Sequence, residues 1–255
     1  MLLAIDVGNT NIVYGVFDGE NLVHKFRVES ARGRTADEYT IALRALLDLH
    51  GVGPERIDAA ILACVVPSLT EPMLSLVRTA FGREAVVVGP GIRTGMAILI
   101  ENPREVGADR IADAVAGFDR AKGGVVVVDF GTSTNFDVVT PKGEYLGGVL
   151  APGLQISADA LFARAAKLPR VEIAKPAKVV GKNTVHAMQS GIVYGYVGLV
   201  DGLVERILGE VGFPCSVIAT GGLASLIAPL SRTITDVDDE LTLIGLRILH
   251  ERNRA

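Results

Sequence analysis

The sequence predicts an α/β protein made of two duplicated halves that face each other across a cleft. Three observations lead to this prediction. The chain has 255 residues, 49% of them hydrophobic and 21% charged, which is enough to bury one large core or two smaller ones. Strand-like and helix-like segments alternate along it. Finally, a pattern around residue 6 returns around residue 129.

The repeat opens each half with a strand, a polar glycine turn and a second strand. Residues 2–20 read LLAIDVGNTNIVYGVFDGE, and residues 125–144 read VVVVDFGTSTNFDVVTPKGE. Apolar runs on both sides of a short polar turn are typical of a β-hairpin. Superposing the copies, which lie 123 positions apart, aligns Asp6 with Asp129, Gly8 with Gly131, Thr10 with Ser133 and Asn11 with Thr134.

Local signals predict the other elements. The capping box from Thr35 to Glu38 predicts a helix that stops at Gly51. Further strands are expected over residues 57–66, 85–88 and 216–219, and further helices over 70–81, 108–120, 158–167, 185–208 and 241–253. With one repeat at the start of each part, we expect an N-terminal half over residues 1–118 and a C-terminal half over residues 119–255.

Charge and composition exclude several classes of protein. The chain has 25 basic and 29 acidic residues, a balance that argues against nucleic acid or an anionic membrane as its main partner. Cys64 and Cys215 stand in apolar stretches, which indicates buried side chains rather than a disulfide framework. No leader pattern stands at the start, and the longest uncharged apolar stretch, residues 191–200, is too short to cross a membrane. We therefore expect a cytoplasmic protein.

The two Asp-x-Gly turns carry the chemistry. Tight turns rich in Gly, Thr, Ser and Asn present backbone N–H groups and hydroxyls to phosphate oxygens. An Asp at the end of the preceding strand can hold a hard cation such as Mg²⁺. Two such turns would bind a polyphosphate from both sides, whereas the simpler alternative is a pair of ordinary hairpin turns. Dinucleotide, P-loop, hydrolase-elbow and zincin motifs are all absent from the sequence.

The motifs resemble those of a known superfamily. The hairpins resemble the two phosphate motifs of the superfamily that contains actin, the Hsp70 ATPase domain and sugar kinases, and ATGG at residues 219–222 resembles its adenosine motif. From about residue 2 to residue 253, the chain resembles the type III pantothenate kinases. This resemblance implies two ribonuclease H-like domains of the actin-like ATPase type with an interdomain cleft. The stretches that support it are NPREVGADR at 102–110, GGVLAPG at 147–153, GKNT at 181–184 and LTLIGLR at 241–247.

The resemblance also implies a reaction, which is the ATP-dependent phosphorylation of pantothenate to 4′-phosphopantothenate, the first step of coenzyme A synthesis. Mg²⁺ would accompany ATP, and a monovalent cation, K⁺ or NH₄⁺, would be required. Asp109 would be the base, Asp6 would help hold Mg²⁺, and Asp129 would bind the monovalent cation. The implied ATP contacts are Asp6, Val7, Gly8, Asn9, Thr10, Asn11, Ile12, Val13 and Thr132, and the implied pantothenate contacts are Gly107, Ala108, Asp109, Arg110 and Thr184.

Local chemistry agrees with these roles for Asp109 and Arg110. Asp109 falls in the first turn of a predicted helix, where the helix dipole favours a carboxylate by roughly 0.3–1 kcal/mol. We therefore expect it to stay ionised and to be a weak base, which the loose transition state of phosphoryl transfer tolerates. Arg110 can bind a carboxylate or a phosphate with two parallel hydrogen bonds. The alternative roles are helix capping for Asp109 and a surface ion pair for Arg110.

Two features bear on assembly and substrate. Gly191, Gly195, Gly198 and Gly202 form one stripe on a predicted helix, which indicates another backbone packed closely against it. That backbone belongs either to another helix of the chain or to a second copy, and the resemblance implies a homodimer. Ile100 stands where many members of the family have Tyr near the substrate.

Two other functions remain open. The first is a phosphotransferase or phosphatase that uses the same scaffold for another small substrate, because a fold does not determine a substrate. The second is a non-enzymatic regulator. Asp6, Asp109 and Asp129 argue against a regulator, since three carboxylates gathered in one site repel each other unless cations or chemistry use them.

Overall fold

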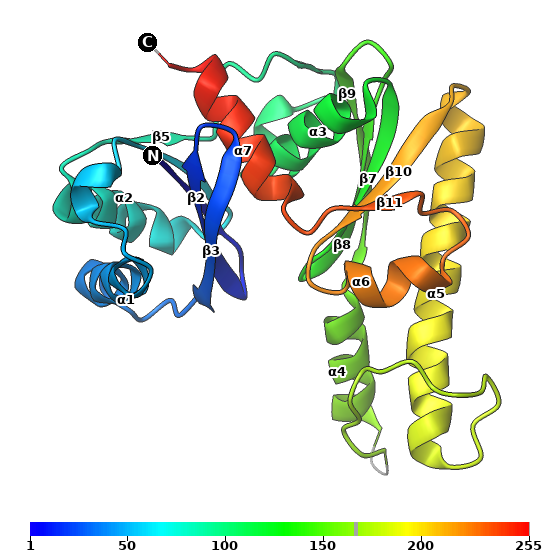
Figure 1. Ribbon diagram of the computed structural model, residues 1–255. Helices are drawn as coiled ribbons and strands as arrows, with labels where there is room; N and C mark the ends of the chain where they lie inside the picture. Colours follow the sequence, from blue (N-terminus) through cyan, green and yellow to red (C-terminus); the bar gives the residue numbers. More distant parts are fainter. Residues whose placement is uncertain (166–167, 255) are drawn as a thin grey trace. The chain divides into compact units, whose positions relative to one another are not determined.

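The computed structural model describes residues 1–165 and 168–254, which divide into two compact units (Figure 1). Unit 1 comprises Met1–Ala97, Glu101–Ala116 and Leu241–Ala255, and unit 2 comprises Ile98–Ile100 and Gly117–Glu240. The predicted halves were residues 1–118 and 119–255. The units differ from them chiefly at the C-terminal end of the chain, because the segment from Leu241 onward groups with unit 1.

Unit 1 is built on a five-stranded mixed sheet in the order β3-β2-β1-β4-β5. Strands β1, β2 and β3 are antiparallel neighbours, whereas β4 runs parallel to both β1 and β5. The first predicted hairpin therefore forms the centre of the sheet. The strands are β1 Leu2–Val7, β2 Asn11–Asp18, β3 Asn21–Glu29, β4 Ala59–Cys64 and β5 Ala85–Val87.

Helices complete unit 1. Thr35 caps α1 with both hydrogen bonds of the predicted capping box. Helix α2 begins at Pro67, three residues before its predicted start, because proline fits the first turn of a helix. Helix α7 packs on β1 and β4. The helical elements are α1 Ala36–Leu49, η1 Pro54–Arg56, α2 Pro67–Phe81, η2 Pro103–Glu105, α3 Ala108–Ala121, whose last five residues belong to unit 2, and α7 Leu241–Arg252.

Unit 2 has a six-stranded sheet in the order β11-β10-β7-β8-β9-β6. Apart from the edge strand β6, this order and the strand directions repeat those of unit 1, with β7 to β11 in the places of β1 to β5. The two units thus share one topology, as the internal repeat predicts. The strands are β6 Ala97–Ile98, β7 Gly124–Phe130, β8 Ser133–Val139, β9 Glu144–Pro152, β10 Cys215–Thr220 and β11 Asp236–Val237.

The strand register corrects the alignment of the repeats. Val7 pairs with Ile12 in the first hairpin, whereas Phe130 pairs with Thr134 in the second. Thr134 therefore corresponds to Ile12 and not, as the sequence alignment has it, to Asn11. Both sheets then have a register shift at equivalent places, between Val16 and Phe17 and between Val138 and Val139, which lie 122 positions apart. The first turn is one residue longer than the second.

The helices of unit 2 differ from those of unit 1 in length. In Figure 1, α4 runs beside the 28-residue helix α5, and the two are in contact. Helix α4 begins four residues before the predicted position 158, and Lys167, its predicted end, lies outside the described residues. The helical elements are α4 Leu154–Arg164, α5 Thr184–Val211, α6 Ala224–Ile227 and η3 Ala228–Leu230.

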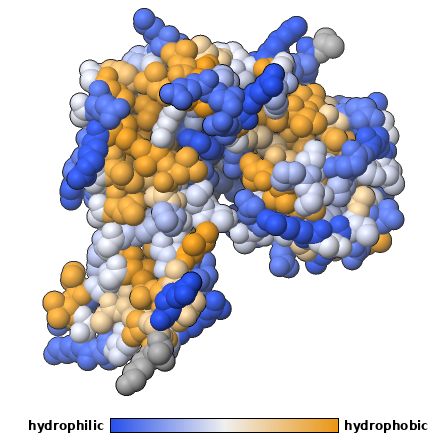
Figure 2. Space-filling model, turned by 180° about the vertical axis from the view of Figure 1, so that it is seen from behind, coloured by the Kyte–Doolittle hydropathy of each residue, from blue (hydrophilic) through white to orange (hydrophobic). Residues whose placement is uncertain are grey.

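No described backbone packs closely against the glycine stripe of α5. A Cβ atom built on Gly191, Gly195 or Gly198 would have no neighbour within 4 Å, and one on Gly202 would meet only the side chain of Arg206. The first of the two expected partners, another helix of the same chain, is therefore not found among the described residues. Apolar side chains also gather on the surface of the α4–α5 part of unit 2 (Figure 2), among them Ile156, Leu161 and Val185.

Two further observations complete the fold. Cys64 and Cys215 are both free and half-buried. Within residues 1–165 and 168–254, no helix combines the length and the apolar character that a membrane crossing requires.

Candidate active site

The first Asp-x-Gly hairpin joins β1 to β2 in unit 1. Asp6 is the last residue but one of β1 and pairs with Val13 across the hairpin and with Ala63 of β4. Three residues make the turn, and the Gly8 N–H donates to the Asn11 carbonyl oxygen over 3.0 Å. Asn9 and Thr10, at the tip, are exposed. The tip therefore presents backbone and polar side chains to a ligand.

The residues of this predicted motif are of two kinds: some have buried side chains, and the others can contact a ligand. The side chains of Val7 and Ile12 are fully buried in the core of unit 1, so that only their backbone can face a ligand. Gly8 has little room for a side chain, since a Cβ atom there would lie 3.2 Å from the Asn11 carbonyl oxygen. The polar residues of the turn are left to contact phosphates.

The segment Gly107–Arg110 lies at the same edge of the sheet. Val65 links the two, because its N–H donates to the Val7 carbonyl oxygen over 3.0 Å and its side chain lies 3.7 Å from a Cβ atom built on Gly107. Asp109 stands in the first turn of α3, as predicted. The structure thus brings together, within unit 1, the first phosphate motif and most of the predicted pantothenate contacts.

The carboxylate of Asp109 is enclosed more than the sequence suggested. Its Oδ1 accepts a hydrogen bond from the Arg110 N–H over 2.8 Å, and a Cβ atom on Gly107 would lie only 2.5 Å from the same oxygen. Burial raises the pKa of Asp109 above its ordinary value and outweighs the opposing effects of this hydrogen bond and of the Arg110 charge. The expectation of a weak base is therefore corrected, because desolvation exceeds the influence of the helix end.

The second hairpin joins β7 to β8 in unit 2. Asp129 pairs with Asn135 across this hairpin and with Thr220 of β10. Glycines surround its carboxylate: a Cβ atom would lie 2.5 Å from Oδ1 if built on Gly221 and 3.2 Å from Oδ2 if built on Gly131. Gly221 has a φ of +89°, which also favours glycine. Asp129 and the predicted adenosine motif are therefore neighbours.

Thr132 lies in the same turn, next to the β9–α4 junction. The Gly153 N–H donates to the Thr132 carbonyl oxygen over 3.1 Å, and a Cβ atom on Gly153 would collide with that oxygen. The GGVLAPG stretch thus supports the second phosphate motif through backbone contact. This contact is not evident from the sequence, because Thr132 and Gly153 are 21 positions apart.

Thr184 is the first residue of α5 and is exposed. The Asn183 side chain caps this helix by accepting a hydrogen bond from the His186 N–H over 2.8 Å. Thr184 borders an apolar groove of about 500 Å³ between α4 and α5, with Leu161, Leu168, Ala187, Met188, Gly191 and Ile192.

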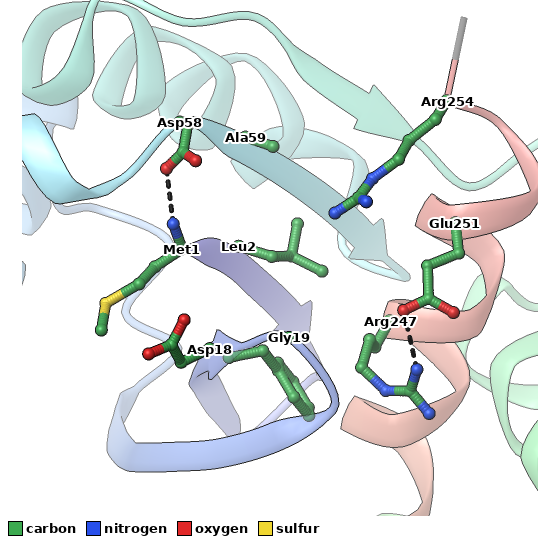
Figure 3. A pocket seen from close by; sticks show the side chains of 10 residues that line it. Met1, Leu2, Asp18, Gly19, Asp58, Ala59, Arg247, Glu251 and Arg254 are labelled. Atoms are coloured by element: carbon green, nitrogen blue, oxygen red, sulfur yellow. Dashed lines mark hydrogen bonds and ion pairs between the residues drawn. The ribbon is translucent and has the colours of Figure 1, made fainter.

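A second pocket lies at the other end of the unit 1 sheet and contains none of the predicted residues (Figure 3). It has a volume of about 190 Å³ and lies where β1 begins and β2 ends. Its charged groups are largely engaged with each other, since Arg247 pairs with Glu251 over 2.8 Å and the Met1 amino group pairs with Asp58 over 2.5 Å. We therefore locate the candidate active site at the hairpins and not in this pocket.

Neither hairpin is a complete metal centre. Within the described ranges, no three His, Cys, Asp or Glu side chains are grouped so as to hold a metal ion. Asp6 and Asp129 each bring one carboxylate to a strand end rich in backbone oxygens and N–H groups. This donor set suits a hard cation that takes its other ligands from phosphate oxygens, carbonyls and water.

The fold and the duplicated hairpins define a protein of the actin-like ATPase and sugar-kinase class. MreB 5 of Spiroplasma citri, solved with AMPPNP bound, superposes with a TM-score of 0.55 at 10% identity, covering 98% of this chain and 96% of that one. An inorganic polyphosphate/ATP-glucomannokinase from Arthrobacter sp. strain KM superposes with a TM-score of 0.50 at 16% identity, covering 99% of each chain. At these identities the likeness concerns the fold, and it confirms the predicted fold class.

Sequence comparison then identifies the family. The sequence model described as type III pantothenate kinase matches residues 2–206. Curated type III pantothenate kinases from Pelobacter propionicus and Geobacter sulfurreducens are 58% and 57% identical to this chain over 254 residues, and the first match covers 100% of both chains. The chain belongs to the type III pantothenate kinase family. This confirms the predicted family and, with it, the expectation of an ATP-dependent kinase acting on pantothenate.

Proposed function

We propose that this chain transfers the γ-phosphoryl group of ATP to the primary hydroxyl of pantothenate, the first step of coenzyme A synthesis. The observation that carries the proposal is that the first Asp-x-Gly hairpin and the partly buried carboxylate of Asp109 lie at the same edge of the unit 1 sheet, linked through Val65. A phosphate-binding turn beside a base of raised pKa is the arrangement that phosphoryl transfer to an alcohol needs.

Asp109 acts as the base. Its carboxylate accepts a hydrogen bond from the substrate hydroxyl and takes the proton as the new phosphorus–oxygen bond forms. The Arg110 N–H already donates to Oδ1, which holds the carboxylate in place and leaves Oδ2 for the substrate. A raised pKa strengthens Asp109 as a proton acceptor.

The segment from Asp6 to Val13 and the residue Thr132 contact ATP. Exposed Asn9 and Thr10, together with backbone N–H groups of the turn, bind phosphate oxygens. Asp6 helps to hold Mg²⁺, which neutralises phosphate charge when it is bound. Asp129, whose carboxylate lies close to the backbones of Gly131 and Gly221, binds the monovalent cation, K⁺ or NH₄⁺.

Pantothenate contacts Gly107, Ala108, Asp109, Arg110 and Thr184. The guanidinium of Arg110 is suited to the substrate carboxylate, because its two parallel N–H groups match that shape. The groove beside Thr184 is lined by apolar side chains, which suits the aliphatic part of the molecule. Ile100, which stands in place of a common family Tyr, packs beside Gly147 of β9 and offers no hydroxyl.

The protein forms a homodimer in the cytoplasm. Support for the dimer comes from α5, whose exposed Gly191, Gly195 and Gly198 would let the backbone of a second copy approach closely. Light scattering at micromolar concentration tests it, and a monomer there would contradict it.

The test of the reaction is ADP release from Mg²⁺-ATP, measured with and without pantothenate, in K⁺ and then in Na⁺ buffer. Turnover that requires pantothenate and is stimulated by K⁺ is the expected result. ATP hydrolysis that does not depend on pantothenate would support the nucleotide site but contradict pantothenate as the substrate. No turnover in either buffer would contradict the proposed kinase activity.

A further inference from the structure

The segment between β3 and α1, residues 30–34, lies against the first phosphate turn. The Ser30 hydroxyl donates to the Gly8 carbonyl oxygen over 2.6 Å, and the Ser30 N–H donates to the Thr10 carbonyl oxygen over 3.0 Å. Two residues on opposite sides of the turn are thereby tied to one residue of the segment. The turn and the segment form a single polar surface.

The segment itself is anchored in the core of unit 1. The Tyr39 hydroxyl accepts a hydrogen bond from the Ala31 N–H over 2.9 Å and donates one to the Ala31 carbonyl oxygen, also over 2.9 Å. The Tyr39 ring is fully buried. At the other end, Thr35 is held as the cap of α1. Residues 32–34 therefore project from a backbone fixed on both sides.

Two arginines of this segment point to different partners. The Arg32 guanidinium donates to the Asn9 Oδ1 atom over 3.4 Å, at the tip of the phosphate turn. The Arg34 guanidinium stands over the Tyr39 ring, 5.9 Å from its centroid. Both side chains are exposed, and both carry the same charge. Only Arg32 places a cation at the turn that the proposed function assigns to ATP.

We propose that Arg32 binds the terminal phosphates of the nucleotide. When ATP enters, the guanidinium exchanges the Asn9 amide oxygen, a neutral acceptor, for a charged phosphate oxygen. Charge-assisted hydrogen bonds of this kind are roughly twice as strong as neutral ones. The inference rests on the proposed use of ATP and extends that site by one residue from outside the Asp-x-Gly motif.

The experiment compares Arg32→Gln, Arg32→Lys and the matched control Arg34→Gln, which removes the same charge two residues away. Calorimetry measures the Kd of each protein for adenosine, AMP, ADP and ATP with Mg²⁺. We expect Arg32→Gln to weaken ATP binding by about tenfold, the low end for a lost hydrogen bond to a charged group, because the site is exposed. ADP binding should weaken less, adenosine binding should not change, and Arg32→Lys should retain part of the affinity.

Three results would overturn the inference. Equal weakening for adenosine and ATP would mean that Arg32 only shapes the turn. A similar loss in Arg34→Gln would mean that the general charge matters rather than the contact with Asn9. Unchanged ATP binding in Arg32→Gln would remove Arg32 from the site. The binding measurements need no pantothenate. If the wild-type protein binds ATP but does not phosphorylate pantothenate, the proposed reaction is refuted, while the role of Arg32 in ATP binding can still be tested.

Discussion

The two Asp-x-Gly hairpins have the same strand topology but different surroundings. The turn after β1 is exposed at its tip, and the serine and arginine of a neighbouring segment lie against it. The turn after β7 is also exposed at its tip, at Gly131 and Thr132, but the backbones of Gly153 and Gly221 lie close to its two ends. The two copies share one arrangement of strands and differ in the residues that pack against their turns, which is compatible with the different roles proposed for Asp6 and Asp129.

The helices that follow the fifth strands differ in the same way. Helix α3 carries Asp109 as its second residue, whereas α7 has Thr242 there. The neutral hydroxyl of Thr242 cannot accept a proton from an alcohol as the carboxylate of Asp109 can. The proposed base is therefore present in only one of the two helices.

Asp109→Asn gives the largest expected effect and tests this asymmetry directly. The amide keeps the shape of the side chain but cannot accept the proton, so kcat should fall by about 10²–10⁴-fold, the usual contribution of a general base. Single-turnover kinetics with ATP and pantothenate measure the loss, and thermal unfolding confirms that the variant is folded. Wild-type turnover in this variant would exclude Asp109 from the chemistry.

Asp129→Ala and Asp6→Ala should show whether the two hairpins bind different cations. Asp129→Ala should abolish K⁺ stimulation, while Asp6→Ala should raise the Mg²⁺ concentration needed for half-maximal activity. Titrations of each ion at a saturating level of the other provide the measurement. If both variants lose the same ion dependence, the hairpins share one role.

Gly221→Ala and Gly8→Ala compare the tight packing beside the second turn with the looser packing in the first. A Cβ atom at position 221 would lie 2.5 Å from the Asp129 carboxylate and 2.7 Å from the Phe130 backbone, at a φ of +89°. We expect a loss of about 2 kcal/mol or more in unfolding free energy for Gly221→Ala and less than about 1 kcal/mol for Gly8→Ala. Urea unfolding followed by circular dichroism measures both, and equal losses would contradict the comparison.

The pH dependence of kcat/KM is expected to show the smallest effect. Burial raises the pKa of Asp109, and the base must be ionised to act. Activity should therefore rise with pH through a pKa above the usual aspartate value of about 3.9 and reach a plateau at higher pH. A profile that is flat down to pH 4 would show that the carboxylate is not desolvated when the substrates are bound.

Much of this fold follows from local sequence signals. The capping box of α1, the two glycine turns and the apolar runs of β1, β4, β7 and β10 each depend on residues close together in the chain, and all are found where they are expected. Strands β3 and β9 were not predicted. The burial of β3 alternates along the strand, but polar His24 on its inner face and exposed Val23 on its outer face interrupt the apolar alternation in the sequence.

The sequence predicts which residues form the candidate site, but it does not predict how deeply they are buried or what they contact. The family motifs name Asp6, Asp109 and Asp129. The pKa of Asp109 depends on burial by residues distant in the sequence, and helix position alone predicts the wrong direction. The contact of Arg32 with Asn9 likewise joins residues 23 positions apart, which no local pattern connects.

Helix α7 is the last helix of the chain but belongs to unit 1, which affects how the protein folds during its synthesis. Unit 2 is almost one continuous segment, Gly117–Glu240, whereas unit 1 needs α7, which the ribosome makes after that segment. Gly245 of α7 fits so closely against the Ala112 backbone that a Cβ atom would lie 2.0 Å from the Ala112 carbonyl oxygen. The first turns of α3, which carry Asp109, therefore gain this contact only after α7, the last helix of the chain, has been synthesised.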